Sequence, residues 1–344
     1  MSTPAAPASP HPVIRHDWLA LHQEDIIDPE LPIVDAHHHL WDHVGNRYFV
    51  MDLLGDLSAG HNVRTTVAVE CGAMYRQDAA APLQPIGETE FLNGQAAVSA
   101  SGKYGPARAC AGIVGHANLR LGTQVKDVLQ VHIQAAGGRF RGVRHSSVWH
   151  ADPTARASLA TPPPYLLADA SFREGFAQLA PLGLSFDAWM YHTQLPELLD
   201  LARAFPQTTI VLDHAGGPLG IGPYAGRRSE VLAEWGASMR ELASCPNVNV
   251  KLGGFGMRLF AFDYPNRPRP PSSQELAADI APYVQTCIEL FGAQRCMFES
   301  NFPVDKGAFS YAVMWNAYKR LAQGASAAER QDLFSGTATR VYRL

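Results

Sequence analysis

Short runs of apolar, mostly β-branched residues alternate along the chain with longer amphipathic stretches. The apolar runs predict eight strands, at 33–39, 65–71, 109–115, 140–146, 184–192, 208–214, 248–252 and 296–301. The amphipathic stretches predict helices at 88–100, 125–136, 171–180, 195–205, 230–243, 274–291, 311–322 and 327–334. Nearly continuous apolar strands that alternate with helices are typical of a parallel sheet covered on the outside.

A count of eight strands favours one closed (β/α)8 barrel, the TIM-barrel architecture, over 15–344. Such barrels need about 250 residues, so a chain of 344 has room for long loops at the C-terminal face. Residues 1–14 are rich in Ala, Ser and Pro and predict a disordered tail. We find no internal repeat and no linker that would divide the rest of the chain.

Composition narrows the classes of function. The formal net charge of -4 is not gathered into blocks, which argues against nucleic acid or an anionic membrane surface as partner. No apolar run approaches the roughly 20 residues that span a bilayer, and the N-terminal stretch has no secretory signal. Five cysteines without a Cys-x-x-Cys spacing are typical of a reduced, cytoplasmic protein. We expect a small-molecule substrate, and the sequence does not indicate an oligomeric state.

Ionisable residues stand where the predicted strands end. Side chains alternate along a strand, so His37 and His39 should share one face while His38 takes the other. Other predicted strands carry Glu70, Arg144, His145, His192, Asp213, His214, Lys251, Glu299 and Asn301 at or near their ends. The C-terminal ends of barrel strands form the face where such enzymes place their active sites. Asp213, on the face opposite His214, is expected to orient a neighbour or cap a helix.

The motifs at 35–42, 141–144, 212–216, 250–252 and 302–304 resemble the amidohydrolase superfamily. The closer match is its lactonase-like branch, the amidohydrolase-related family that includes 2-pyrone-4,6-dicarboxylate and sugar lactonases. The motifs spread from 33 to 304, and their combination is specific. The resemblance implies a hydrolase whose site contains His37, His39 and His214.

The eighth strand departs from the family pattern, which usually has an aspartate where this chain has Asn301. A side-chain amide cannot take a proton at neutral pH, so Asn301 cannot be a general base. By alternation, Glu299 lies on the same face about 6.6 Å deeper. We therefore expect Glu299 to supply the carboxylate and Asn301 a hydrogen bond; the alternative is a buried Glu299 charge paired with Lys251 or an arginine.

The resemblance leaves the metal question open. His37, His39, His214 and Glu299 would hold one divalent zinc or manganese ion. Members of the lactonase-like branch also work without metal, with histidines that polarise the carbonyl directly.

The favoured hypothesis is hydrolysis of a small, carboxylate-bearing lactone, or a related ester or amide. Arg144 would bind the anionic end, helped by arginines between 258 and 269, and Glu299 or Glu70 would activate water. His145, His192, Glu70 and Lys251 complete the expected substrate-binding set, although for Glu70 a salt bridge and for His192 a wall position are alternatives. Two other hypotheses stay open: decarboxylation of an aromatic or unsaturated acid, and a non-catalytic barrel that binds a small acid.

Overall fold

The computed structural model describes residues 11–43, 45–158 and 161–344. Eight parallel strands form one sheet: β1 (Ile33–His38), β4 (Val63–Val69), β5 (Arg108–Gly115), β6 (Phe140–Arg144), β7 (Ser185–Ala188), β8 (Ile210–Leu212), β9 (Val248–Leu252) and β10 (Cys296–Phe298). The two edges meet through a parallel bridge between His38 and Phe302, where the His39 N–H donates to the Phe302 carbonyl. The sheet thus closes into the predicted (β/α)8 barrel.

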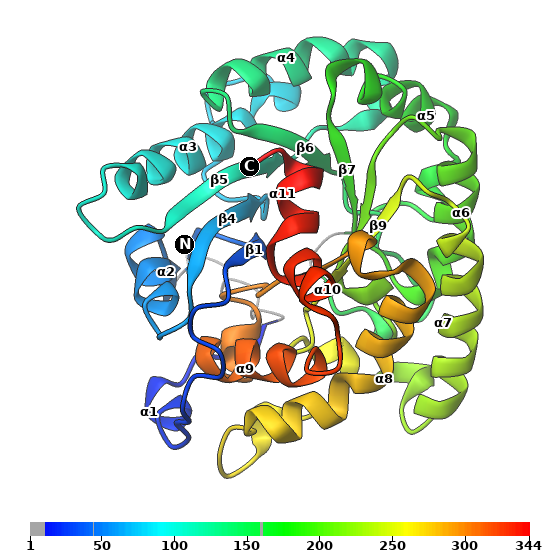
Figure 1. Ribbon diagram of the computed structural model, residues 1–344. Helices are drawn as coiled ribbons and strands as arrows, with labels where there is room; N and C mark the ends of the chain where they lie inside the picture. The colour runs from blue at the N-terminus through cyan, green and yellow to red at the C-terminus, as the bar shows by residue number, and fades with distance from the viewer. Residues whose placement is uncertain (1–10, 44, 159–160) are drawn as a thin grey trace, which may run out of the picture.

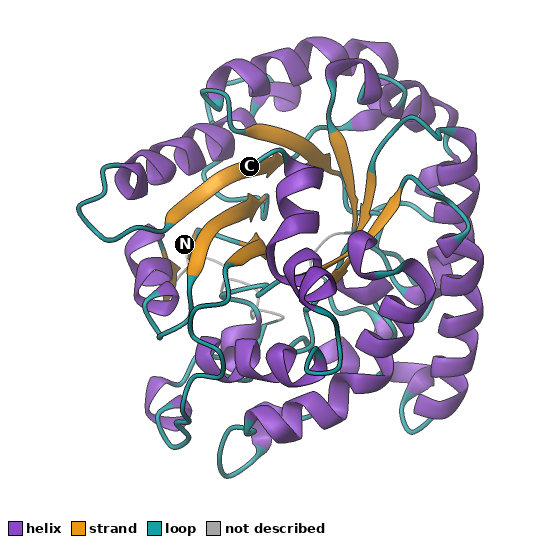
Figure 2. Ribbon diagram, in the orientation of Figure 1, coloured by secondary structure: helices purple, strands orange, loops and turns teal. Residues whose placement is uncertain are grey.

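Helices surround the strands (Figure 1; Figure 2). They are α1 (His16–Leu19), α2 (Val50–Leu57), α3 (Ile86–Ala100), α4 (Val125–Ala135), α5 (Ala170–Phe176), α6 (Leu195–Ala204), α7 (Arg228–Ala243), α8 (Ser273–Phe291), α9 (Tyr311–Leu321), α10 (Ala327–Gln331) and α11 (Thr337–Tyr342). A two-stranded hairpin of β2 (Trp41–His43) and β3 (Asn46–Tyr48) follows β1. No helix in the described ranges has both the length and the apolar character needed to span a bilayer.

The barrel interior holds a small apolar layer that the C-terminal helix closes. Seven strand residues pack together there: Val34, Ala36, Val67, Val69, Val114, Val211 and Met297. Ala338 and Tyr342 of α11 complete this layer, and Tyr342 is fully buried. In Figure 1, α11 lies in front of the central strands. One end of the barrel is therefore filled by apolar side chains, which leaves the opposite end for polar chemistry.

Six strands end earlier than the sequence predicts, and three of these, 33–39, 65–71 and 140–146, stop at His38, Val69 and Arg144. The predicted strands 184–192, 208–214 and 296–301 stop at Ala188, Leu212 and Phe298. The residues beyond these points leave the ladder and turn into the loops, so period-two alternation no longer fixes their side chains.

The two ends of the chain also differ from expectation. The predicted helix 327–334 is α10 followed by a π turn at Asp332–Gly336, and α11 continues the chain. Of the predicted tail 1–14, residues 1–10 lie outside the described residues. His11 packs on the barrel, with its ring stacked on Trp41 at a centroid distance of 5.6 Å.

Candidate active site

A bulge in the first strand aims two histidines at the barrel mouth. The register between β1 and β4 shifts between Asp35 and His38. An extra residue in a strand re-aims the side chains that follow it. Ala36 lies in the interior layer, whereas His37 and His39 bring their Nε2 atoms to 3.1 Å of each other. His38 instead contacts Thr66, so the structure places His37 and His39 together, as alternation predicts.

Glu299 joins His37 to His214. Its Oε2 lies 3.0 Å from His37 Nδ1, and its Oε1 accepts a 2.6 Å hydrogen bond from His214 Nδ1. All three side chains are buried. Burial alone would raise the pKa of Glu299, but the charges and hydrogen bonds of His214 and His37 lower it to about 2. The carboxylate is therefore ionised, and its partners are imidazoles rather than Lys251 or an arginine.

A glycine makes room for this carboxylate. A Cβ at Gly253, directly after β9, would come within 2.3 Å of Glu299 Cγ. A larger residue there would displace Glu299 from between the two rings.

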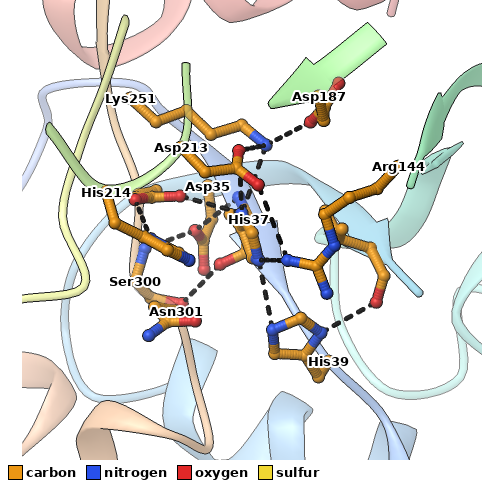
Figure 3. Close-up of polar contacts among 12 residues, drawn as sticks. Asp35, His37, His39, Arg144, Asp187, Asp213, His214, Lys251, Ser300 and Asn301 are labelled. Atoms are coloured by element: carbon orange, nitrogen blue, oxygen red, sulfur yellow. Dashed lines mark hydrogen bonds and ion pairs between the residues drawn. The ribbon is translucent and has the colours of Figure 1, made fainter. Parts of the chain in front are cut away.

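A buried ion cluster lies next to His37 (Figure 3). Lys251 Nζ is 2.6 Å from Asp187 Oδ2, 3.1 Å from Asp213 Oδ1 and 3.2 Å from His37 Nδ1. The Tyr342 hydroxyl donates to Asp187 Oδ2 at 2.7 Å. Burial would lower the pKa of Lys251, but Asp187 and Asp213 raise it above its usual value. Lys251 is thus a charged residue under the site, remote from the cavity surface.

Asp213 belongs to this cluster and does not face away from it. It lies 3.6 Å from His37 Nδ1 and 3.5 Å from Arg144, besides its contact with Lys251. Because β8 ends at Leu212 and His214 takes a left-handed φ of 54°, strand alternation does not hold across this pair. Burial raises the pKa of Asp213, but Lys251 and His37 together hold it well below the usual value.

Arg144 closes the other side of the cluster. Its Nε donates to Glu70 Oε1 at 2.7 Å, and a second guanidinium N–H donates to the Glu70 carbonyl. The remaining nitrogen lies 3.5 Å from both Asp213 and His37 Nε2. Glu70 therefore forms the salt bridge that was its alternative predicted role. Few of the Arg144 N–H groups remain available to bind a ligand.

A cavity of about 550 Å³ opens above these groups. Its polar wall includes His39, Glu70, Arg144, His145, His214 and Asn301, and its aromatic wall includes Trp41, Tyr75 and Trp189. His145 Nδ1 also accepts from the Leu119 N–H at 3.2 Å. His192 stands elsewhere: it begins a 3-10 turn, accepts from the Leu219 N–H and packs on Tyr224.

Asn301 lines the cavity, and Asp305 lies behind it. The Asn301 N–H donates to the His37 carbonyl at 2.8 Å, and its side-chain Nδ2 donates to Asp305 Oδ1 at 2.9 Å. Asp305 is fully buried, and burial raises its pKa to about 7 against the opposing effect of its hydrogen-bond donors. Asp305 was not predicted, because it lies outside every predicted strand.

The donor set fits a divalent cation. His37, His214 and Glu299 offer ligand atoms that lie within 4.8 Å of one another. His39 Nδ1 donates to the Val69 carbonyl, so its Nε2 carries a lone pair 3.1 Å from His37 Nε2. Two nitrogens on one zinc ion at tetrahedral angles lie about 3.3 Å apart.

Charge around the histidines points the same way. Four buried acids face two permanent cations: Glu70, Asp187, Asp213 and Glu299 against Arg144 and Lys251. This network therefore carries a surplus of negative charge, to which the buried acids Asp35 and Asp305 beside it add when they are ionised, and such a surplus suits a cation. Lys251 is 3.2 Å from His37 Nδ1 and Arg144 is 3.5 Å from His37 Nε2, so a cation bound at either nitrogen of that ring would lie close to a permanent positive charge.

Several known proteins are similar to this chain over most of its length. The chain is 33% identical over 338 residues to the uncharacterized protein y4mH of Sinorhizobium fredii, a match that covers 92% of this chain and 99% of that one. It is 29% identical to L-fucono-1,5-lactonase of Burkholderia multivorans, over 90% of this chain and 96% of the enzyme. A crystal structure of an amidohydrolase from B. multivorans with bound zinc superposes with a TM-score of 0.69 at 28% identity, covering 91% of this chain and 99% of that one. The amidohydrolase family model matches residues 34–344, so the chain belongs to the amidohydrolase family of hydrolases.

Proposed function

We propose that the protein hydrolyses a lactone, with His214 as the general base and Glu299 as its positioning carboxylate. The observation that carries this proposal is the 2.6 Å hydrogen bond between His214 Nδ1 and Glu299 beneath the cavity. The lactonase from B. multivorans, which is similar over most of the chain, supports the reaction class.

The proton moves through His214. Its Nδ1–H is donated to the ionised Glu299, which leaves Nε2 as the lone-pair nitrogen of a ring that lines the cavity. As the water oxygen bonds to the lactone carbonyl carbon, its proton passes to Nε2, and Glu299 stabilises the imidazolium. The same proton is then returned to the ring oxygen when the carbon–oxygen bond breaks, which yields the open hydroxy acid. Glu299 is itself too deeply buried to touch the water.

His37 can take two tautomers that correspond to two versions of the site. With the proton on Nε2, His37 donates to His39 Nε2 and accepts from Lys251 at Nδ1. With the proton on Nδ1, facing Glu299, the Nε2 lone pairs of His37 and His39 converge and would hold a zinc or manganese ion. When bound, such an ion supplies a Lewis acid that polarises the lactone carbonyl.

We propose a neutral, hydroxylated lactone as substrate rather than a carboxylate-bearing one. Arg144 is the permanent cation among the described residues that line the cavity, and Glu70 and Asp213 already engage it. Of the three arginines between 258 and 269, Arg258 donates to the Arg156 carbonyl, Arg267 pairs with Asp279 and Arg269 pairs with Glu275. Trp41 and Trp189 offer flat apolar faces, and the imidazoles offer donors and acceptors for hydroxyl groups.

The test is turnover of a panel of sugar lactones and dicarboxylate lactones by the wild type and by Glu299→Gln. General base catalysis is worth roughly 10²- to 10⁴-fold, so we expect kcat to fall by that factor in Glu299→Gln. The control is Glu275→Gln, which removes an exposed carboxylate at the α8 cap. Wild-type turnover that is unchanged by Glu299→Gln would remove this residue from the mechanism.

The metal is tested on the same protein. Elemental analysis should find about one equivalent of zinc or manganese, and chelation should lower turnover, if the second tautomer describes the working enzyme. Full activity in a metal-free preparation would assign the reaction to the first tautomer.

A further inference from the structure

Asn301 presents a side-chain amide at the cavity, and the direction of that amide decides what it can bind. Asn301 lines the cavity and takes a left-handed φ of 53°. Its N–H donates to the His37 carbonyl at 2.8 Å, so its backbone is fixed to β1. The amide could still offer the cavity either an NH₂ donor or an oxygen acceptor.

Asp305 removes this ambiguity. Its Oδ1 accepts from Asn301 Nδ2 at 2.9 Å, and its Oδ2 accepts from the Gly256 N–H at 2.9 Å. Above its pKa of about 7 the Asp305 carboxylate is ionised and only accepts, so the NH₂ end of Asn301 faces it. Gly256 allows this close approach, because a Cβ there would lie 2.8 Å from Asp305 Cα.

We propose that Asp305 is a positioning residue that turns the Asn301 amide oxygen toward the cavity, where this oxygen accepts a hydrogen bond from the attacking water. The inference rests on the proposed lactone hydrolysis. The amide orients the water and takes no proton, because the proton passes to His214. The Asp305 carboxylate polarises the Asn301 amide through its NH₂ group, which makes the amide oxygen a stronger hydrogen-bond acceptor. Asn301 thereby supplies a fixed acceptor close to His37 and to the His214–Glu299 pair.

Asp305→Asn tests the orientation directly. The buried Gly256 N–H still requires an acceptor, so the new amide must offer it its oxygen. Its NH₂ group then faces Asn301, which must reverse its own amide to accept from it. The atom that Asn301 offers to the water changes from an acceptor to a donor, while side-chain volume is nearly unchanged.

The exchanged pair Asn301→Asp/Asp305→Asn should restore the acceptor. The new amide at 305 would accept from Gly256 and donate to the carboxylate at 301, which would leave a carboxylate oxygen toward the cavity. A structural role for the pair alone would not make the double variant more active than Asp305→Asn.

Kinetics at pH 8.5, where the Asp305 carboxyl group is ionised, should show kcat lowered ten- to a hundredfold by Asp305→Asn, with KM changed less than threefold. The double variant should recover at least tenfold in kcat over the single one. Asp279→Asn, which removes a carboxylate that accepts from Tyr264 and does not line the cavity, should keep kcat within twofold. Unchanged kcat in Asp305→Asn, or no recovery in the double variant, overturns the inference while lactone hydrolysis stands.

A second readout is independent of turnover. In ¹⁵N NMR, the Asn301 carboxamide protons, held by a buried carboxylate, should exchange with solvent at least tenfold faster in Asp305→Asn than in the wild type. If the wild type turns over no lactone, the proposed function fails; equal exchange rates in the two proteins would instead overturn the assigned amide direction.

Discussion

Lys251 offers the sharpest test of the buried cluster. The Lys251→Met substitution keeps an unbranched chain of similar length but removes the ammonium from between Asp187 and Asp213, both of which are fully buried. Removal of one partner from a buried ion pair costs about 3–5 kcal/mol, because the remaining charge is left without compensation. For 344 residues the entropy of unfolding is roughly 0.7 kcal/mol per kelvin, so Tm should fall by about 4–7 °C.

The assay is calorimetric unfolding of four proteins: wild type, Lys251→Met, Asp187→Asn and the double variant. In the Asp187→Asn background, the Lys251 ammonium keeps one of its two ion-pair partners, Asp213. The Lys251→Met substitution should therefore lower the free energy of unfolding by at least about 1 kcal/mol less in this background than in the wild type. Arg227→Met breaks an exposed pair with Glu230 and should change stability by less than about 0.5 kcal/mol. Additive effects of Lys251→Met and Asp187→Asn, within about 0.5 kcal/mol, would refute the account of this cluster.

Two further predictions concern Glu88, which lies behind the cavity wall, and Arg144, which lines the cavity. Burial, with the nearby charge of Glu70, raises the pKa of Glu88 to about 8. Because the folded protein holds this proton more tightly than the unfolded chain, the Glu88 contribution to the free energy of unfolding is complete below about pH 4.5 and is lost as pH rises through 8. In Glu88→Gln the amide oxygen can still accept from the Cys71 and Ala73 N–H groups. In denaturant titrations, the free energy of unfolding of this variant minus that of the wild type should therefore rise by about 4 kcal/mol between pH 5 and pH 9. A difference that stays constant with pH would contradict this prediction. Arg144→Lys loses the two-point grip on Glu70 and should lower kcat/KM about tenfold in the lactone assay; wild-type kinetics would show that the grip is dispensable.

Most of the barrel could be predicted from the sequence, because strands buried on both faces appear as continuous apolar runs. The same rule also shows where prediction fails. Side-chain alternation, when it is applied past the last residue of the strand ladder, predicts that Asp213 faces away from His214 and that His192 ends a strand. Both predictions are wrong, because the two strands end at Leu212 and Ala188. Where the ladder stops, the backbone of His214 turns left-handed, and no period-two rule describes it.

The residues that sequence analysis missed depend on closure of the barrel. Asp187 stands out in the sequence as an acid inside the apolar run 184–192, which indicates that it needs a buried partner. That partner, Lys251, is 64 residues away along the chain, so the sequence alone does not identify it. Asp305 lies in a turn after β10, and only the fold brings it to Asn301 and Gly256. The sequence does predict that His37, His39, Arg144 and Glu299 lie near one another, because each stands at or near a strand end, and strand ends converge at one face of any such barrel.

The hydrogen bond from Tyr342 to Asp187 has a consequence for the order in which the protein is made. The two residues are 155 positions apart, so at about 5–20 residues per second Asp187 is synthesised roughly 8–31 s before its hydroxyl partner. Throughout that interval the apolar layer of the barrel lacks Ala338 and Tyr342. The interior can be sealed only after α11 has been translated, so until then the unfinished barrel exposes apolar strand residues that the finished protein buries.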